Sequence, residues 1–460
     1  MECISILLMT ASQGKHTLSE KEEALLAKAS QMSTVPNEVF SKFNNADVKF
    51  GKVKRENGQE DELTNGNFAT FMESHDRAVR KAAFEALYKQ YGAYINTIAA
   101  AFYGNVKQAM FYADARGYKS TLNMYLDGSF IPENVYKNLI KTVNDNLDKM
   151  YRYVDIRKKA LGVDELHFYD IYAPMVEDID WKISYDEAKD IVVKALAPMG
   201  EEYVSHIKEG FNNGWVDVYE NTGKRSGAFS WGAYGTHPYV FLNYSDTLND
   251  VFTVIHEMGH AMHTYYSNAN QPYIYAGYKI FVAEVASTCN EAILMQYMLK
   301  NTDDEKKKRY LLNHFFEQFK GTLYRQTMFA EFEMEAHAKA EHGEVLSAES
   351  LCAMYKKLNE KYFGPDMVID DEIALEWARI PHFYTPFYVY QYATGYSAAI
   401  AISTKILAGD EQVIAGYRKF LSGGSSMHPI ELLKLCGIDM TRPDVVQEAL
   451  DVFWELLKQW

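Results

Sequence analysis

Cysteine is scarce in this sequence, and its few cysteines form no recognisable motif. The 460 residues contain only four, Cys3, Cys289, Cys352 and Cys436, with no C-x-x-C pair among them. Widely spaced cysteines in a chain of this length indicate free thiols in a reducing compartment. The N-terminus also lacks the basic segment of a secretory signal peptide, since Glu2 has the wrong charge for one. We therefore expect a cytoplasmic protein without a disulfide framework.

Long apolar runs, basic tracts and low-complexity segments are also missing. No apolar run reaches the length needed to span a membrane. The net charge is −15, from 47 Lys and Arg against 62 Asp and Glu, and an acidic surface argues against nucleic acid or an anionic membrane as the main partner. We expect neither as a partner, and the sequence does not indicate the oligomeric state.

Most of the chain carries a helical pattern. Apolar residues spaced three and four apart predict long helices, with Asn65 or Asn67 as a cap, Pro132 near one start and Gly162 at one end. The segment 227–247 differs, because it is rich in Gly, Tyr, Val and Phe and has no helical period. It predicts a short sheet with a hairpin turn near Gly235. The fold class is therefore mainly α, with one large helical body and a small sheet. The predicted helices cover residues 63–117, 132–162, 304–341 and 443–459.

A histidine-rich segment follows this sheet directly. His256, Glu257 and His260 form the pattern H-E-x-x-H on a predicted helix. Residues four apart share one helix face, about 5–6 Å apart at Cβ, which suits two imidazoles binding one Zn²⁺. Glu257 lies beside the first ligand, where its carboxylate can reach a metal-bound water without being a ligand. The pattern also arises by chance in roughly a few per cent of such sequences, so a third ligand is needed to support it.

Zinc sites built on the H-E-x-x-H pattern differ in the residue that supplies the third ligand. Tyr266 stands where a histidine would complete the pattern H-E-x-x-H-x-x-G-x-x-H, which excludes that version. Glu284 interrupts the apolar face of a later predicted helix, and a buried carboxylate is costly unless it is paired or bound to a metal. We favour Glu284 as the third ligand over an ion pair in the core. Glu291, two turns further on, and His263 can support the ligands from behind, although purely structural roles carry equal weight.

Two other segments can contribute to a site. The strand region around Gly232, Gly235 and His237 can offer an open edge to which an extended peptide adds through main-chain hydrogen bonds, while a structural role is the commoner one for His237. The segment 379–399 contains His382 and five tyrosines, and two prolines prevent a regular helix at its start. Such a loop can supply neutral donors to a developing oxyanion. Packing of the aromatic rings against the core is the alternative that the residues alone favour.

The stretches "HEMGHAMHTYYSNANQPYIY" and "FVAEVASTCNE" resemble the thimet oligopeptidase and oligoendopeptidase F family of zinc peptidases. The resemblance is closest to the bacterial oligoendopeptidase F branch and covers roughly residues 16–460. It includes "HTLSEKEEALLAKAS", "NNADVKFG", "SGAFSWGAYGTHPYVFLNY", "ARIPHFYTPFYVYQYATGYSAA" and "FLSGGSS". It implies a helical zincin-type body divided by a deep channel that holds one Zn²⁺ per chain. The implied ligands are His256, His260 and Glu284, with Glu257 as the catalytic acid and base.

The resemblance also implies roles for the aromatic segment. The family uses a histidine and tyrosines there to bind substrate and stabilise the tetrahedral intermediate. His382 matches this histidine, and Tyr388 and Tyr392 are the tyrosines we expect to act in catalysis. Tyr396 is expected to bind substrate, together with Gly232 and His237. The tyrosine spacing departs from the thimet branch, so the sequence does not assign a separate role to each tyrosine.

The resulting hypothesis is a zinc-dependent endopeptidase that hydrolyses short unstructured oligopeptides, with Glu257 as general base on a zinc-bound water. We expect an unaligned N-terminal extension (1–15), an N-terminal helical region (16–200) and a zinc peptidase catalytic region (201–460). Family members usually carry a further N-terminal helical segment, so the chain is expected to be a shortened form. The alternatives are an inactive or weakly active peptide-binding remnant that keeps the metal site, and a zinc hydrolase acting on a non-peptide amide.

Overall fold

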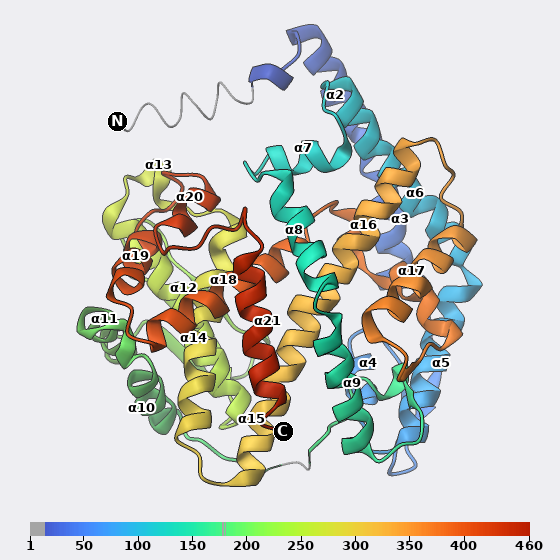
Figure 1. The fold of residues 1–460 in the computed structure, drawn as a ribbon. Helices are drawn as coiled ribbons and strands as arrows, with labels where there is room; N and C mark the ends of the chain where they lie inside the picture. The colour runs from blue at the N-terminus through green and yellow to red at the C-terminus, as the bar shows by residue number, and fades with distance from the viewer. Residues whose placement is uncertain (1–13, 177–178, 180) are drawn as a thin grey trace.

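The computed structural model describes residues 14–176, 179 and 181–460. Cys3 and most of the expected N-terminal extension lie outside these residues. Helices make up most of the described chain, as expected from its composition and periodicity (Figure 1). The first half contains α2 (Glu20–Ser33), α3 (Val35–Lys42), α4 (Phe68–Met72), α5 (Arg77–Ala93), α6 (Ile95–Ala115), α7 (Thr121–Asp127), α8 (Glu133–Asn144), α9 (Leu147–Leu161), α10 (Tyr185–Ala195) and α11 (Glu201–Asn212). The second half contains α12 (Leu248–Asn270), α13 (Tyr273–Ala276), α14 (Ile280–Lys300), α15 (Glu305–Gln318), α16 (Arg325–Glu341), α17 (Ala348–Phe363), α18 (Tyr390–Leu407), α19 (Glu411–Leu421), α20 (Pro429–Lys434) and α21 (Asp444–Leu457).

The predicted helices are present, with breaks that the periodicity did not locate. The predicted helix over 63–117 is three helices, because Asp76 caps α5 by accepting the N–H of Ala78 and Tyr94 separates α5 from α6. The prediction over 304–341 is confirmed as α15 and α16, joined by a π-helical segment, η5 (Phe319–Tyr324). Gly162 ends α9 in the left-handed conformation, with φ of 64°.

The predicted small sheet has three strands, β4 (Val216–Tyr219), β5 (Phe229–Trp231) and β6 (Tyr239–Tyr244), in the order β4-β6-β5. The β5–β6 pair is antiparallel, which confirms the predicted hairpin, and Gly235 turns between the strands with φ of 83°. One edge of β5 is therefore free of any described strand. Two small two-stranded sheets were not predicted. They pair β1 (Lys52–Lys54) with β2 (Glu60–Glu62), and β3 (Leu166–His167) with β7 (Met367–Val368).

One hydrophobic core joins most of these helices. Within the left half of Figure 1, α14 packs against both α12 and α18. Helices α16 and α17, from the second expected region, pack against α6, α8 and α9 from the first. These contacts cross the expected boundary at residue 200, which stays a prediction.

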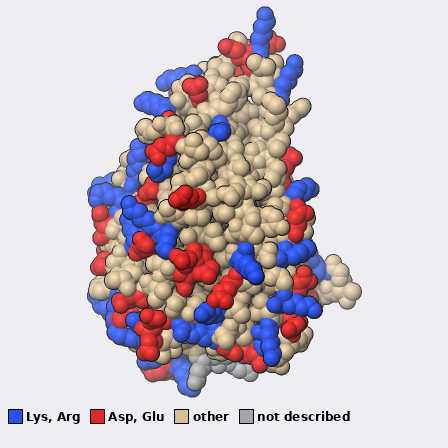
Figure 2. Space-filling model, turned by 90° about the vertical axis from the view of Figure 1, so that its right-hand side faces the viewer, with Lys and Arg blue, Asp and Glu red and all other residues tan. Residues whose placement is uncertain are grey.

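The surface is charged in a mixed way. Figure 2 shows Lys and Arg side chains interspersed with Asp and Glu over the lower part of one face, while uncharged residues cover much of its centre and upper part. None of the described helices combines the length and apolar character that crossing a bilayer requires.

The contact between α12 and α14 depends on a glycine inside the H-E-x-x-H helix. A Cβ atom at Gly259 would lie 2.7 Å from Cα of Ser287 and 2.8 Å from the carbonyl oxygen of Ala286. Both atoms belong to the backbone of α14 and cannot rotate away. The absence of a side chain at Gly259 thus lets the two helices approach at this level.

We therefore expect Gly259→Ala to force α12 and α14 apart. Overpacking of this kind typically lowers the free energy of unfolding by about 1–3 kcal/mol, and the loss is measurable by thermal and urea denaturation. Gly277→Ala is the matched control, because a Cβ there would meet no atom within 4 Å and the φ of Gly277 is −72°. Equal stability of the two variants would contradict this account of the helix contact.

Candidate metal centre and active-site cleft

The helix that carries the histidines begins with a well-formed cap. Thr247 and Asp250 form a capping box, in which the Asp250 carboxylate accepts the Thr247 N–H at 2.9 Å and the hydroxyl at 2.7 Å. From this fixed start, α12 runs through the core with apolar residues on most of its surface. His256 and His260, one turn apart, direct their rings toward α14, and the ring centroids lie 4.8 Å apart.

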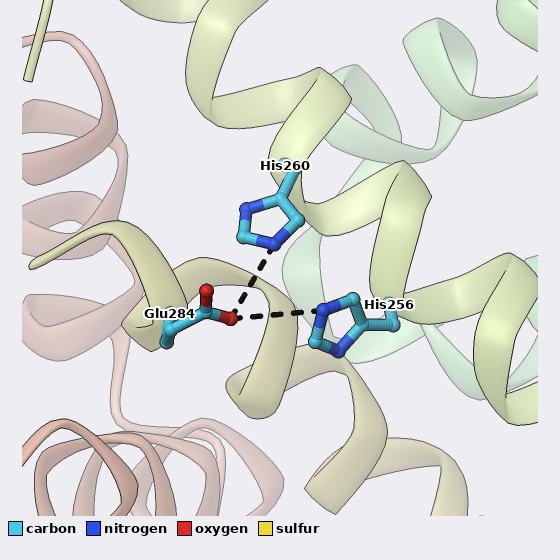
Figure 3. A group of neighbouring side chains, drawn as sticks. All are labelled: His256, His260 and Glu284. Carbon is cyan, nitrogen blue, oxygen red and sulfur yellow. Dashed lines mark ion pairs between the residues drawn. The ribbon is translucent and has the colours of Figure 1, made fainter. Parts of the chain in front are cut away.

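The structure brings His256, His260 and Glu284 together (Figure 3). The Nε2 atoms of His256 and His260 lie 3.6 Å and 3.4 Å from Oε2 of Glu284. One ligand atom from each residue lies within 4.8 Å of the other two. Burial alone raises the pKa of the Glu284 carboxyl, but the nearby histidines lower it to about 2, so this carboxylate is ionised. Two imidazole nitrogens and an ionised carboxylate are a donor set that fits a divalent metal ion.

Two residues hold His256 from behind. Nδ1 of His256 donates a hydrogen bond to Oε1 of Glu291, which leaves Nε2 free on the side of Glu284. The other oxygen of Glu291 accepts a hydrogen bond from the side-chain amide of Gln318 at 2.8 Å. This chain of contacts selects one tautomer and one ring orientation of His256, as carboxylates commonly do for metal-binding histidines.

Glu257 lies in the wall of a cleft of about 660 Å³ that the three clustered residues also line. Only 6% of Glu257 is exposed, and its buried Oε2 has no hydrogen-bond partner among the described residues. Burial raises the pKa of this carboxyl. An unpaired buried carboxyl is costly for folding. Here the residue lines the same cleft as His256, His260 and Glu284.

The other wall of the cleft is the strand β5. Residues 228–232 line it, and Trp231 is 74% exposed there. Gly232 permits this arrangement, because a Cβ at this position would lie 2.7 Å from the methyl group of Thr264 on α12. The strand end can therefore lie against the histidine helix with its free edge along the cleft.

Two histidines of the candidate site take no part in the cluster. His263 is buried and stacks on Tyr278, with ring centroids 3.6 Å apart, and Tyr278 itself lines the cleft. His237 stacks on Trp215 at 5.5 Å, and its Nδ1 donates a hydrogen bond to the carbonyl of Pro238. Neither lines the cleft among the described residues.

The aromatic segment forms a cluster of its own. After a short 3₁₀ turn, Pro381–Tyr384, the chain bends before α18 begins at Tyr390. The ring of His382 lies 6.2 Å from that of Tyr388 and 6.0 Å from that of Tyr392, and the two tyrosine rings are 5.5 Å apart.

These three residues differ from Tyr396 in their surroundings. The pKa of Tyr392 is raised to about 12 by burial, by a hydrogen bond with Tyr388 and by the charge of Glu284. His382 is open to solvent, yet partial burial lowers its pKa, so it is neutral at pH 7. Tyr396 instead packs in the core, 5.0 Å from Phe319, and its buried hydroxyl has no hydrogen-bond partner.

Several residues of the site were not predicted from the sequence. Ser287 donates a hydrogen bond to Glu284 at 3.0 Å, and its position three residues later on the same helix was a usable signal. Gln318 comes from α15, and no pattern in the chain relates it to Glu291. Trp231 and Tyr278 occur within or beside segments that the motifs single out, but only the folded cleft reveals their position.

A helical body, an H-E-x-x-H helix, an acidic partner on the next long helix and a strand edge beside them define a helical metallopeptidase architecture. Family comparison agrees, and the chain belongs to peptidase family M3. The model of that family matches residues 70–452, and a model described as oligopeptidase F matches residues 9–50. Because M3 is a family of metallopeptidases, a bound metal is implied.

Individual relatives extend over nearly the whole chain. It is 54% identical to oligopeptidase PepF of Bacillus subtilis and 43% identical to an oligoendopeptidase F homolog of Lactococcus lactis, over 96% of its own length in both cases. It spans only 66% of the first relative and 74% of the second. The crystal structure of oligoendopeptidase-F from Enterococcus faecium superimposes with a TM-score of 0.84 at 37% identity, over 99% of this chain and 76% of that one.

The contact between His256 and Glu291 leads to a prediction about metal affinity. Glu291→Ala removes the acceptor that holds the His256 ring, and we expect affinity for a divalent metal to fall about 10- to 100-fold. Competition with a chromophoric chelator, using Zn²⁺ as the probe, measures this change. Gln296→Ala is the control, since Gln296 lies on the same helix and lines a different groove. Unchanged affinity in Glu291→Ala would show that Glu291 does not orient the ligand.

Proposed function

We propose that the chain is a zinc-dependent endopeptidase that hydrolyses short, unstructured oligopeptides. One observation carries this proposal. The ligand atoms of His256, His260 and Glu284 lie within 4.8 Å of one another, in the wall of a cleft that also contains Glu257 and the free edge of β5. Metal ligands, a candidate base and a peptide-aligning strand edge are the parts that metal-assisted hydrolysis of a peptide bond requires.

His256, His260 and Glu284 would hold a single zinc ion. When bound by two histidines and a glutamate, zinc acts as a Lewis acid that lowers the pKa of water and polarises a carbonyl group. Glu291 and Gln318 keep the His256 ring in the orientation that binding needs. The remaining chemistry belongs to the side chains around these ligands.

Glu257 is the proposed general base and acid. Glu257 lines the cleft beside His256, His260 and Glu284, and its raised pKa favours uptake of a proton from the attacking water. The protonated carboxyl then donates the proton to the leaving amine.

The free edge of β5 is the proposed guide for the substrate backbone. An extended peptide can add to such an edge through its own N–H and C=O groups. This mode uses the main chain and suits unstructured substrates of varied sequence. The exposed side chain of Trp231 offers an apolar contact at the same edge.

His382, Tyr388 and Tyr392 are the proposed donors to the oxyanion. Tyr392 has a pKa of about 12 and His382 a lowered pKa, so both are neutral at pH 7 and each has an N–H or O–H to donate. Neutral donors held in place can stabilise developing negative charge without a counter-ion. Gly232 lines the cleft and is a proposed contact for the substrate. For Tyr396 and His237, which do not line the cleft among the described residues, supporting roles are proposed.

The relatives support the choice of substrate class. Their names, oligopeptidase and oligoendopeptidase, describe cleavage of short peptides. Since the chain spans about two thirds of the Bacillus relative, activity and substrate are proposed for it and not transferred. The described cysteines Cys289, Cys352 and Cys436 are free thiols, which supports a reducing, cytoplasmic location.

Replacing Glu257 by Gln is the direct test of the mechanism. The amide cannot accept the proton, so we expect kcat on a quenched short peptide to fall about 10²- to 10⁴-fold. Zinc content, measured by atomic emission on the same preparation, should stay at one ion per chain. A variant that keeps its zinc and cleaves at the parent rate would disprove the assignment of Glu257.

Glu209→Gln serves as the control, because this glutamate is exposed on α11, its side chain pairs with His206, and it does not line the cleft. Removal of the metal with a chelator should abolish turnover, and added Zn²⁺ should restore it. Turnover that survives chelation would exclude the metal mechanism. A protein that binds zinc and peptides but does not cleave them would instead be a peptide-binding remnant.

A further inference from the structure

The backbone at Phe387 adopts a conformation that L-residues rarely use. Its φ is 55°, in the left-handed region, although it carries a bulky aromatic side chain. Such strain persists only where surrounding contacts determine the conformation. Phe387 immediately precedes Tyr388, the first tyrosine of the cluster formed by His382, Tyr388 and Tyr392.

The side chain of Phe387 is held on one side by a group of rings. Its centroid lies 4.6 Å from that of His337, 5.8 Å from Tyr136 and 5.9 Å from Tyr125. Only 3% of Phe387 is exposed. This packing fixes the ring, but it does not account for the buried backbone N–H of the same residue.

A glutamate on α16 holds that N–H. Oε1 of Glu333 accepts the hydrogen bond from Phe387 at 2.9 Å. Glu333 is completely buried, and its other oxygen, Oε2, has no hydrogen-bond partner in the part of the chain that the structure describes. Burial raises the pKa of this carboxyl to about 8, although the hydrogen bond from Phe387 acts in the opposite direction.

Glu333 is unlike other buried acidic residues of the protein. Glu331, two residues earlier, is paired with Lys361 and accepts the hydroxyl of Tyr362. Glu376 is paired with Arg325. Glu333 has no such cation among the described residues, and its one hydrogen bond goes to the strained residue before Tyr388. An apolar residue would fit this core at lower cost, so stability alone does not explain a carboxyl here.

We propose that Glu333 is a positioning residue, which holds the Phe387 backbone in its left-handed conformation and thereby directs Tyr388 toward His382 and Tyr392. The proposal rests on the proposed peptidase function, since it assigns these three rings to catalysis. Glu333 itself touches neither the metal-type cluster nor the cleft among the described residues. Its effect is exerted through the direction of the chain at Phe387.

Three variants separate positioning from stability. Glu333→Leu fills the space but removes the acceptor for the Phe387 N–H. Glu333→Gln keeps an acceptor oxygen at nearly the same place. Glu331→Leu is the matched control, because it removes a buried carboxylate of the same helix that pairs with Lys361 and makes no hydrogen bond to Phe387 among the described residues.

We expect kcat of Glu333→Leu on a quenched peptide to fall roughly 10- to 100-fold, because misplaced catalytic groups cost that much. KM should stay within about threefold of the parent, since the loss affects the transition state. Zinc content should not change. Glu333→Gln should keep a kcat within about threefold of the parent, and Glu331→Leu should lower the melting temperature but leave kcat of the folded protein unchanged.

Other outcomes would overturn the proposal. A parent-like kcat in Glu333→Leu, or a Glu333→Gln variant as impaired as Glu333→Leu, would show that the hydrogen bond does not position the segment. An equal fall of kcat in Glu331→Leu would assign the effect to general destabilisation. If Glu333→Leu does not fold, Glu333→Met replaces it, and the Gln variant still tests the role of the acceptor.

A crystal structure of Glu333→Leu provides a test that needs no turnover. We expect Phe387 to leave the left-handed region and the Tyr388 ring to move away from His382. If φ of Phe387 stays near 55° with Tyr388 in place, the proposal is wrong, whatever the activity. If the parent chain does not cleave peptides but this movement occurs, the proposed function fails while the structural role of Glu333 stands.

Discussion

The close contact between α12 and α14 is the constraint on which the rest of the site depends. At Gly259 the two helices approach so closely that a methyl group would overlap the backbone of α14. This approach places Glu284 opposite His256 and His260, and Glu291 behind His256. The same contact lies in the centre of the left half of the molecule, where α14 also packs on α18. The distance between the backbones of α12 and α14 at Gly259 therefore affects both the packing of the core and the positions of the clustered side chains.

Two buried carboxyls, those of Glu257 and Glu333, have no Lys or Arg partner among the described residues. Glu257 lines the cleft and buries an oxygen that has no partner among the described residues, and Glu333 lies in the core with one hydrogen bond to a strained backbone. Other buried acids, such as Glu331 and Glu376, are paired with Lys361 and Arg325. An unpaired buried carboxyl reduces stability. This cost supports the proposed roles of Glu257 as general base and of Glu333 as positioning residue. Proteins commonly tolerate such conflicts near functional sites.

The cleft combines elements from distant parts of the chain. The strand β5 and the helices α12 and α14 form its walls, and Gly232 lets the strand end lie against Thr264. The aromatic cluster of His382, Tyr388 and Tyr392 comes from a segment about a hundred residues further on, and the charge of Glu284 contributes to the raised pKa of Tyr392. The helical frame thus brings His256, His260, Glu284 and Glu257 to one cleft from two helices that are neighbours in the core.

The sequence by itself determined the helical class, the hairpin before the histidine helix and the candidate ligands, because these follow from local periodicity and from spacing along one helix. It also marked Glu284, since a carboxylate in an apolar helix is costly wherever that helix packs. Tertiary structure decided what local patterns do not encode: that Gln318 holds Glu291, that His237 and His263 stack on other rings, and that Glu333 meets Phe387. Those contacts join residues far apart in the chain or depend on side-chain direction, and both are fixed only when the helices pack.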